Sequence, residues 1–301
     1  MQSADFLSAV FFYLKVGENL NQNWIVENLN NAFSTWNGKL GELWGLVTTG
    51  PQTFKGGAVW SVMQTLHNGM VGIGYALVVL FFAISLCKNT MNFHELKRPE
   101  AAIHYFLRFV AAKALVGYGM DIMLNVFSIC NGIVTDMADS MGGISEAMVS
   151  LPAEMQTAIE NVGFLASIPL WLVTILGSLF ITVLSFVMIL TVYGRFFRLY
   201  MYTALAPLPL AAFAGESTQS VGISFLKSYV GVCLEGAVIV LACVIYSAFV
   251  STPTVASGEA TTIVWSYLAE TVFNMLVLVG LIKGSDRIIP VSYTHLTLPT
   301  K

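Results

Sequence analysis

The feature that most constrains the fold is a long uncharged run in the middle of the chain. Between Asn161 and Gly194 the sequence contains no Asp, Glu, Lys or Arg. A helix over this run would be about 50 Å long, whereas a hydrocarbon core of about 30 Å needs only about 20 apolar residues. The whole chain is 56% hydrophobic and only 10% charged, against about 25% charged in soluble domains. We therefore expect an all-α, polytopic membrane protein with at least one over-long spanning helix.

Apolar stretches separated by polar loops predict about five spans within a transmembrane domain of residues 66–290. A further apolar segment, 199–215, is short and contains Pro207 and Pro209. Interior prolines remove helix hydrogen bonds and clash with the preceding turn. We expect this segment to be broken, and re-entrant or buried against protein, with the prolines ending a hairpin or acting as a hinge. The five expected spans are 66–87, 101–135, 163–193, 221–250 and 262–282.

Residues 1–65 predict an extracytoplasmic or interfacial region of amphipathic helices. Trp24, Trp36 and Trp44 lie in it, and tryptophan is typical of membrane interfaces. An apolar stripe with spacings of three and four places its members on one helix face. This face can lie on the bilayer or on a neighbour, or it can associate with a second copy. The stripe consists of Val26, Leu29, Phe33, Trp36, Leu40, Leu43 and Val47.

The distribution of charge orients the spans, because Lys and Arg accumulate in cytoplasmic loops. With the loop 88–100 inside and 199–215 only dipping into the membrane, ten Lys and Arg lie on or near the cytoplasmic side. Three lie outside. The outer segment 136–161 then carries only acidic charges, and the outer loop 251–261 has no Lys or Arg. This pattern favours an N-terminus outside and a C-terminus in the cytoplasm. The acidic residues of the outer segment are Asp136, Asp139, Glu146, Glu154 and Glu160.

The last residues, 291–301, resemble a translated sequencing adapter. The resemblance covers the ten consecutive residues VSYTHLTLPT. We interpret this tail as non-native. We expect the natural C-terminal residues to be missing from about Pro290 onward. His295 and Lys301 are therefore given no role.

Motifs for enzymatic chemistry are absent from the sequence, which has no phosphate-binding loop, serine nucleophile elbow or zinc-binding His-Glu-x-x-His. His67, His94 and His104 do not have the spacing of a metal-ligand set. We therefore predict no catalytic, cofactor-binding or metal-binding residues, and no cofactor. The cysteines are interpreted as small buried apolar residues; they are Cys87, Cys130, Cys233 and Cys243.

Ionisable residues within spans are costly and often mark function. Asp121, Glu235 and Glu270 either line a wet path or pair with basic partners that fix helix packing. Arg195 and Arg198 anchor the end of the third span, or form a docking point for a cytoplasmic ATPase or substrate phosphates. Small residues permit close helix approach at Gly69, Gly72 and Gly74.

The topology and one segment, RFFRLYMYTALAPLPLAAF at 195–213, resemble the TrbL-type family of inner-membrane subunits of type IV secretion and conjugation machines. The terminal Lys283-Gly-Ser-Asp-Arg-Ile-Ile is similar to the family's cytoplasmic exit, and the resemblance covers most of 60–290. It implies a bacterial cytoplasmic-membrane subunit, encoded on a mobile element, that helps move single-stranded DNA with its relaxase. It also implies partner secretion subunits including cytoplasmic ATPases, a homo-oligomer in the lipid bilayer, and transient contact with single-stranded DNA.

Two other functions fit parts of the pattern. A proton-coupled secondary transporter would use the broken segment and the intramembrane carboxylates, although no second broken segment marks an inverted repeat. A non-conducting membrane scaffold would use the apolar stripe to recruit partners. The outer segments are acidic or neutral, unlike DNA-binding surfaces, so DNA meets other subunits or passes through an oligomeric lumen lined by few charges.

Overall fold

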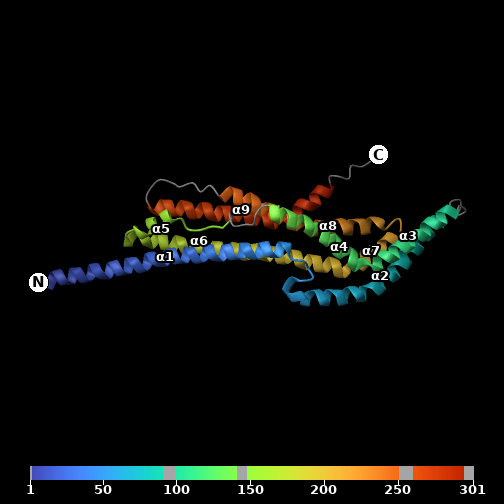
Figure 1. Ribbon diagram of the computed structural model, residues 1–301, viewed down its shortest axis with the longest axis horizontal. Helices are drawn as coiled ribbons and strands as arrows, with labels where there is room; N and C mark the ends of the chain where they lie inside the picture. Colours follow the sequence, from blue (N-terminus) through green and yellow to red (C-terminus); the bar gives the residue numbers. More distant parts are fainter. Residues whose placement is uncertain (1, 91–98, 141–147, 251–259, 295–301) are drawn as a thin grey trace. The chain divides into compact units, whose positions relative to one another are not determined.

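The computed structural model describes residues 2–90, 99–140, 148–250 and 260–294, and within these ranges it is helical with no β-strand (Figure 1). The all-α prediction is confirmed. The long helices are α1 (Gln2–Thr48), α2 (Ala58–Thr90), α6 (Phe164–Leu205), α8 (Gln219–Val250) and α9 (Ala260–Thr294). The shorter elements are η1 (Phe54–Gly57), α3 (Pro99–Gly117), α4 (Gly119–Ser140), α5 (Ala153–Glu160), α7 (Pro207–Ala211) and η3 (Ala212–Ala214).

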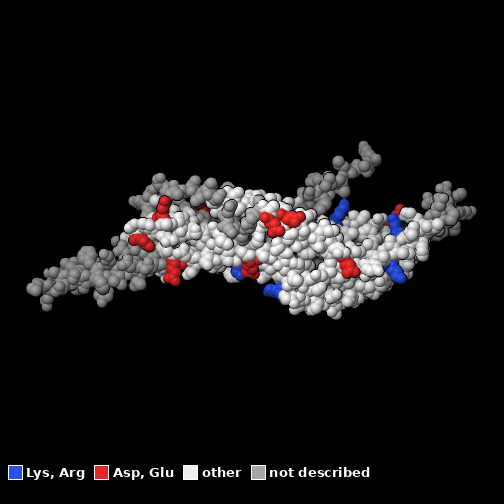
Figure 2. All heavy atoms as spheres, viewed as in Figure 1, with Lys and Arg blue, Asp and Glu red and all other residues white. Residues whose placement is uncertain are grey.

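Four of the described helices are long and apolar enough to cross a membrane, and a bent pair makes a fifth if it counts as one span. Charged side chains are sparse on the face drawn in Figure 2, where most of the described atoms belong to uncharged residues. These features confirm a polytopic membrane protein. The four helical segments are Phe54–Lys88, Ser167–Leu205, Gln219–Ala248 and Thr262–Ile288; the bent pair is Ile103–Gly117 with Gly119–Ser140.

The bent pair divides the segment expected as the single span 101–135. The two helices meet at Tyr118 at an angle of 72°. Glycines flank the bend, and each has a close side-chain neighbour. A Cβ at Gly117 would lie 2.8 Å from the Tyr75 hydroxyl, and one at Gly119 would lie 3.2 Å from Leu210. Because these two residues lack side chains, Tyr75 and Leu210 can lie close to the backbone at the bend. The apolar periodicity of the sequence does not predict the bend.

The chain divides into two compact units, which are described separately. Unit 1 comprises Met1–Gly45, Met141–Thr191 and Ile239–Lys283, and unit 2 comprises Leu46–Ser140, Val192–Val238 and Gly284–Lys301. Helices α1, α6, α8 and α9 each contribute residues to both units.

Unit 1 is built around the apolar stripe of α1. Leu29, Phe33, Trp36, Leu40 and Leu43 are all buried, and the rings of Trp36 and Tyr246 lie 6.3 Å apart. The face departs from the expected stripe at its start, where Ile25 is buried and Val26 is partly exposed. These side chains therefore pack within the chain's own helices, which leaves this face unavailable for association with a second copy.

Unit 2 contains the break expected in 199–215. Helix α6 runs through Arg195 and Arg198 to Leu205, and α7 begins at Pro207, where proline's missing N–H is tolerated in the first helical turn. Helix α7 packs against α2 and α3. A Cβ at Gly74 would lie 2.9 Å from the Pro207 carbonyl oxygen, so glycine permits this approach. Gly69 and Gly72 have open space around them.

Several predictions concern residues outside the described ranges. These are most of the basic loop 88–100, the acidic Glu146, the outer loop 251–259 and residues 295–301 of the tail. Residues 291–294 of the tail continue α9.

Candidate functional site

The most unusual side chain of unit 2 is Arg195, a cation on α6 that is only 1% exposed. Its guanidinium donates hydrogen bonds to three backbone carbonyls, those of Val47 at 3.4 Å, Val232 at 3.3 Å and Cys233 at 3.0 Å. A buried charge is strongly unfavourable unless it is hydrogen-bonded and compensated. The three carbonyls supply the hydrogen bonds, and the Glu235 carboxylate nearby supplies a compensating negative charge.

Arg198 lies on the same face of α6, three residues further on. It forms an ion pair of 2.6 Å with Glu235 of α8 and a longer one of 3.6 Å with Asp286 of α9. Glu235 is 3% exposed and also interacts electrostatically with Arg195. Arg195, Arg198, Glu235 and Asp286 are called the ionic cluster below. The cluster has two positive and two negative groups, so it is electrically neutral, and it joins α6, α8 and α9 within unit 2.

The space for the guanidinium depends on a glycine of α8. A Cβ at Gly236 would lie 2.9 Å from both terminal nitrogens of Arg195, closer than real Cβ contacts. Residue 236 therefore has to lack a side chain for Arg195 to reach the α8 carbonyls.

Polar but uncharged groups surround the cluster. Cys130 on α4 and Cys233 on α8 interact with each other, and the Tyr229 hydroxyl donates to the Met123 carbonyl at 2.8 Å. These contacts join α4 to α8. Three cysteines are buried as expected, whereas Cys87 is exposed.

This arrangement holds helices of unit 2 together. Within the described ranges, no group of three or more His, Cys, Asp or Glu is placed to bind a metal ion. Each charged group of the cluster is engaged by another member, by backbone carbonyls or by both.

Residues 36–207 match the family model described as TrbL/VirB6 plasmid conjugal transfer like protein. The chain belongs to this family. It is a membrane component of a conjugal transfer system, and its family associates with other subunits of conjugation and type IV secretion machines. No curated protein and no solved structure matches the chain.

The part of this TrbL/VirB6-like protein that matches the family contains only half of the ionic cluster. Arg195 and Arg198 lie within 36–207, together with the start of α7. Glu235 and Asp286 follow it. Through these ion pairs, the end of α6 within the family match is connected to α8 and α9, which follow residue 207.

The three predicted intramembrane carboxylates have different surroundings. Glu235 is in the ionic cluster. Asp121 is exposed in the first turn of α4, where a negative charge favourably meets the helix dipole. Glu270 belongs to unit 1, where it is half-buried. The structure therefore brings Glu235 together with Arg195 and Arg198, but it places Asp121 and Glu270 at separate sites.

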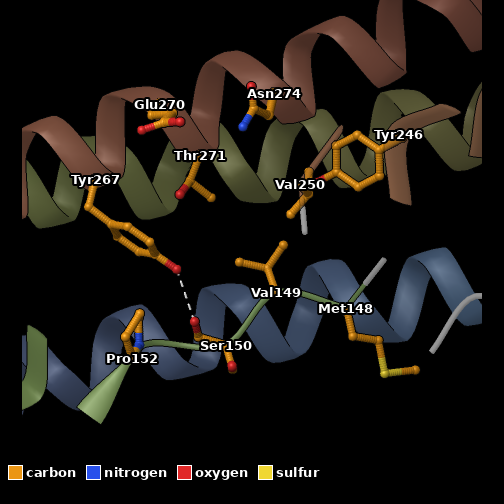
Figure 3. Close-up of a pocket in the computed structure, with 10 residues that line it drawn as sticks. All are labelled: Met148, Val149, Ser150, Pro152, Tyr246, Val250, Tyr267, Glu270, Thr271 and Asn274. Carbon is orange, nitrogen blue, oxygen red and sulfur yellow. Dashed lines mark hydrogen bonds between the residues drawn. The ribbon is translucent and has the colours of Figure 1, made fainter. Parts of the chain in front are cut away.

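Glu270 lines a pocket of about 190 Å³ in unit 1. Figure 3 shows α9 facing the loop before α5 across this pocket, with Tyr267 reaching from α9 to the loop. The Tyr267 hydroxyl donates to the Ser150 carbonyl at 2.9 Å. Apolar and polar side chains both line the space, among them Val149, Val250, Thr271 and Asn274.

Sequence reasoning missed two residues that the structure makes prominent. The sequence pattern includes Asp286 only within the cytoplasmic exit, although its position three residues after Lys283 indicates charge near the membrane. Asn274 carries no charge and lies in an apolar run, so composition alone gave no signal for it.

Proposed function

We propose that this protein is a cytoplasmic-membrane subunit that helps single-stranded DNA, with its attached relaxase, to cross the membrane during conjugation. The observation that carries the proposal is the family match over residues 36–207, which includes α2 to α6 and the basic end of α6. The membrane-spanning helices support a role within the membrane part of the machine.

The ionic cluster supports an anchoring role for its members. Glu235 is already paired with Arg198 at 2.6 Å, so we propose that it fixes helix packing and neither lines a path nor carries protons. Arg195 is buried, whereas the side chain of Arg198 is 32% exposed. Of the two, Arg198 is the one we propose as a docking group for a cytoplasmic ATPase. The exposed Asp121 is the carboxylate we propose to face an aqueous path.

The proposed topology places the N-terminus outside and the C-terminus in the cytoplasm, with α7 and η3 as a re-entrant segment. Large apolar side chains on α2, including Ile73, Val79 and Leu80, are exposed. Such surfaces suit lipid or a neighbouring subunit, in agreement with a homo-oligomer in the bilayer. Residues 1–65 are proposed to be extracytoplasmic or interfacial, and 66–290 to form the transmembrane domain.

The test is a deletion of the gene in its native conjugative element, followed by complementation. We expect the deletion to abolish transfer and the wild-type gene to restore it. Formaldehyde crosslinking of the transferring strand, followed by immunoprecipitation of the subunit, then measures contact with DNA. Normal transfer without the gene would overturn the proposal.

Asp121→Leu separates a path role from a packing role. A path residue should leave the amount of assembled subunit unchanged and lower transfer, because an apolar side chain replaces a hydrated carboxylate. Asp136→Leu is the matched control, since Asp136 is also exposed on α4. Equal transfer by the two variants would contradict the path role of Asp121.

A further inference from the structure

The pocket of unit 1 contains a polar side chain whose hydrogen-bonding capacity is unused. Asn274 is only 9% exposed, and it makes no hydrogen bond to any residue that the structure describes. It is also one of the residues that line the pocket. A buried amide without a partner costs free energy, which a ligand with complementary groups would recover.

The other lining groups indicate the charge of that ligand. Glu270 is the charged residue among the lining side chains, which contain no Lys, Arg or His. Thr271 adds a hydroxyl, and the rings of Tyr246 and Tyr267 add aromatic faces that attract cations. Carboxylate, amide oxygen and hydroxyl are all acceptors for a ligand that donates N–H bonds.

The size of the pocket limits the ligand further. Its volume of about 190 Å³ is below the range of about 300–1,000 Å³ typical of sites for drug-sized molecules. A space of this size, with apolar walls from Val149, Pro152 and Val250, suits one long side chain with an aliphatic stem and a charged end.

We propose that this pocket receives the side chain of a lysine or arginine from an extracytoplasmic segment of a partner secretion subunit. The extracytoplasmic location rests on the topology given under the proposed function. Exposed Glu154 and Glu160 on α5, which follows the pocket loop directly, add negative charge that favours approach of a basic segment. The aliphatic stem packs on the apolar wall, and the cationic end meets Glu270 and Asn274.

The charge preference of the pocket is measured with thiol reagents on the purified full-length protein in detergent. Val250→Cys introduces a thiol in the wall, in a background where the exposed Cys87 is replaced by Ser. The protein without the added cysteine provides the blank, because the other three cysteines are buried. Reaction rates are compared for cationic aminoethyl and anionic sulfonatoethyl methanethiosulfonate.

We expect the cation-to-anion rate ratio to exceed that of a free thiol by about fivefold to tenfold, the effect of one nearby carboxylate. Glu270→Gln should return the ratio to the free-thiol value. Glu160→Gln removes the same charge from an exposed position and should leave the ratio unchanged. Equal ratios in the pocket and in the free thiol would overturn the proposal, and Val149→Cys repeats the measurement if Val250→Cys does not fold.

Competition identifies the kind of cation. N-acetyl-lysine amide and N-acetyl-arginine amide should slow the modification, whereas neutral N-acetyl-norleucine amide should not. Equal protection by the neutral analogue would overturn the cationic specificity. Stronger protection by phosphoethanolamine than by the two amino acid amides would assign the pocket to a lipid headgroup and overturn the partner side chain.

Transfer assays test the role in the assembled machine. Glu270→Gln and Asn274→Leu should lower conjugation at an unchanged level of membrane protein, whereas Glu160→Gln should not. Normal transfer by both pocket variants would overturn the receptor role. The reagent ratio is measured on the isolated protein, so it does not depend on whether the chain serves in DNA transfer, which the gene deletion tests.

Discussion

The two units stabilise their interiors in different ways. Unit 2 buries two charged residues, Arg195 and Glu235, and joins α6, α8 and α9 through the ion pairs of the cluster. Unit 1 relies on the apolar stripe of α1 and on neutral hydrogen bonds, such as that from Asn28 to the Ser178 hydroxyl at 3.0 Å. In the same unit, the Asn37 side chain donates a hydrogen bond to the Val149 carbonyl and accepts one from the Val149 N–H.

The difference affects what a single substitution can do. Removing one member of a buried ion pair leaves the other charge uncompensated. Substitutions of the buried charged residues in unit 2 should therefore be strongly destabilising. Removing one partner of a neutral hydrogen bond costs less, about 1–3 kcal/mol where a buried polar group is left unsatisfied. We therefore expect the free energy of unfolding to be most sensitive to the charged residues of unit 2.

The largest expected effect comes from Glu235→Leu. It leaves Arg195 and Arg198 with Asp286 alone, and we expect the free energy of unfolding to fall by about 3–5 kcal/mol. Thermal unfolding in detergent, together with the amount of inserted protein, measures this. Adding Arg198→Met should restore part of the loss, because a double substitution removes both members of the pair. A loss below about 1 kcal/mol would show that the cluster is no more important than a surface pair.

Gly236→Ala tests the space beside Arg195 without changing any charge. Its Cβ would lie 2.9 Å from the guanidinium nitrogens, so we expect a destabilisation of about 1–3 kcal/mol from overpacking. Gly38→Ala is the matched control in unit 1, because a Cβ there has open space. That variant should be neutral or more stable by up to about 1 kcal/mol, since alanine favours helix. Equal effects at the two positions would argue against a tight fit around Arg195.

Asn37→Ala probes the neutral contacts of unit 1. The variant loses the bonds of 2.8 and 2.9 Å to Val149, and we expect the free energy of unfolding to fall by about 1–2 kcal/mol. Hydrogen exchange of the Val149 amide should speed up, since its acceptor is gone. A loss as large as that of Glu235→Leu would erase the distinction between the units.

The smallest effect is expected from Glu42→Gln. Lys39 and Glu42 form an ion pair of 2.6 Å, but both side chains are about one-third exposed, at 30% and 34%. Solvent screens such a pair, so its loss should change the free energy of unfolding by about 0.5 kcal/mol or less. A larger change in a thermal melt would mean that exposed charges also matter in unit 1.

Local patterns predicted much of the fold. The uncharged run before Arg195 predicted the long helix α6, and the heptad spacing around Trp36 predicted a buried face of α1. Pro207 marked the break after Leu205, because proline excludes the continuation of a helix. Each of these sequence patterns lies within a few residues of the structural feature that it predicts.

What the sequence could not show depends on contacts between distant segments. Arg198 and Glu235 each stand out in the sequence as charges beside or within apolar runs, but their pairing joins residues 37 positions apart. The bend at Tyr118 lies between two glycines that the distant residues Tyr75 and Leu210 approach closely. Asn274 became visible only when the structure showed a buried amide without a hydrogen-bond partner among the described residues.

The neutrality of the ionic cluster has a consequence for helices in any membrane that carries an electrical potential. Its four groups lie within the apolar helices Ser167–Leu205, Gln219–Ala248 and Thr262–Ile288. A single charge carried across the bilayer would gain or lose about 2.3 kcal/mol per 100 mV. The two cations and two anions experience opposing forces, so the membrane potential does no net work when they move as a group. Helices joined in this way can keep their packing when the potential across the membrane changes.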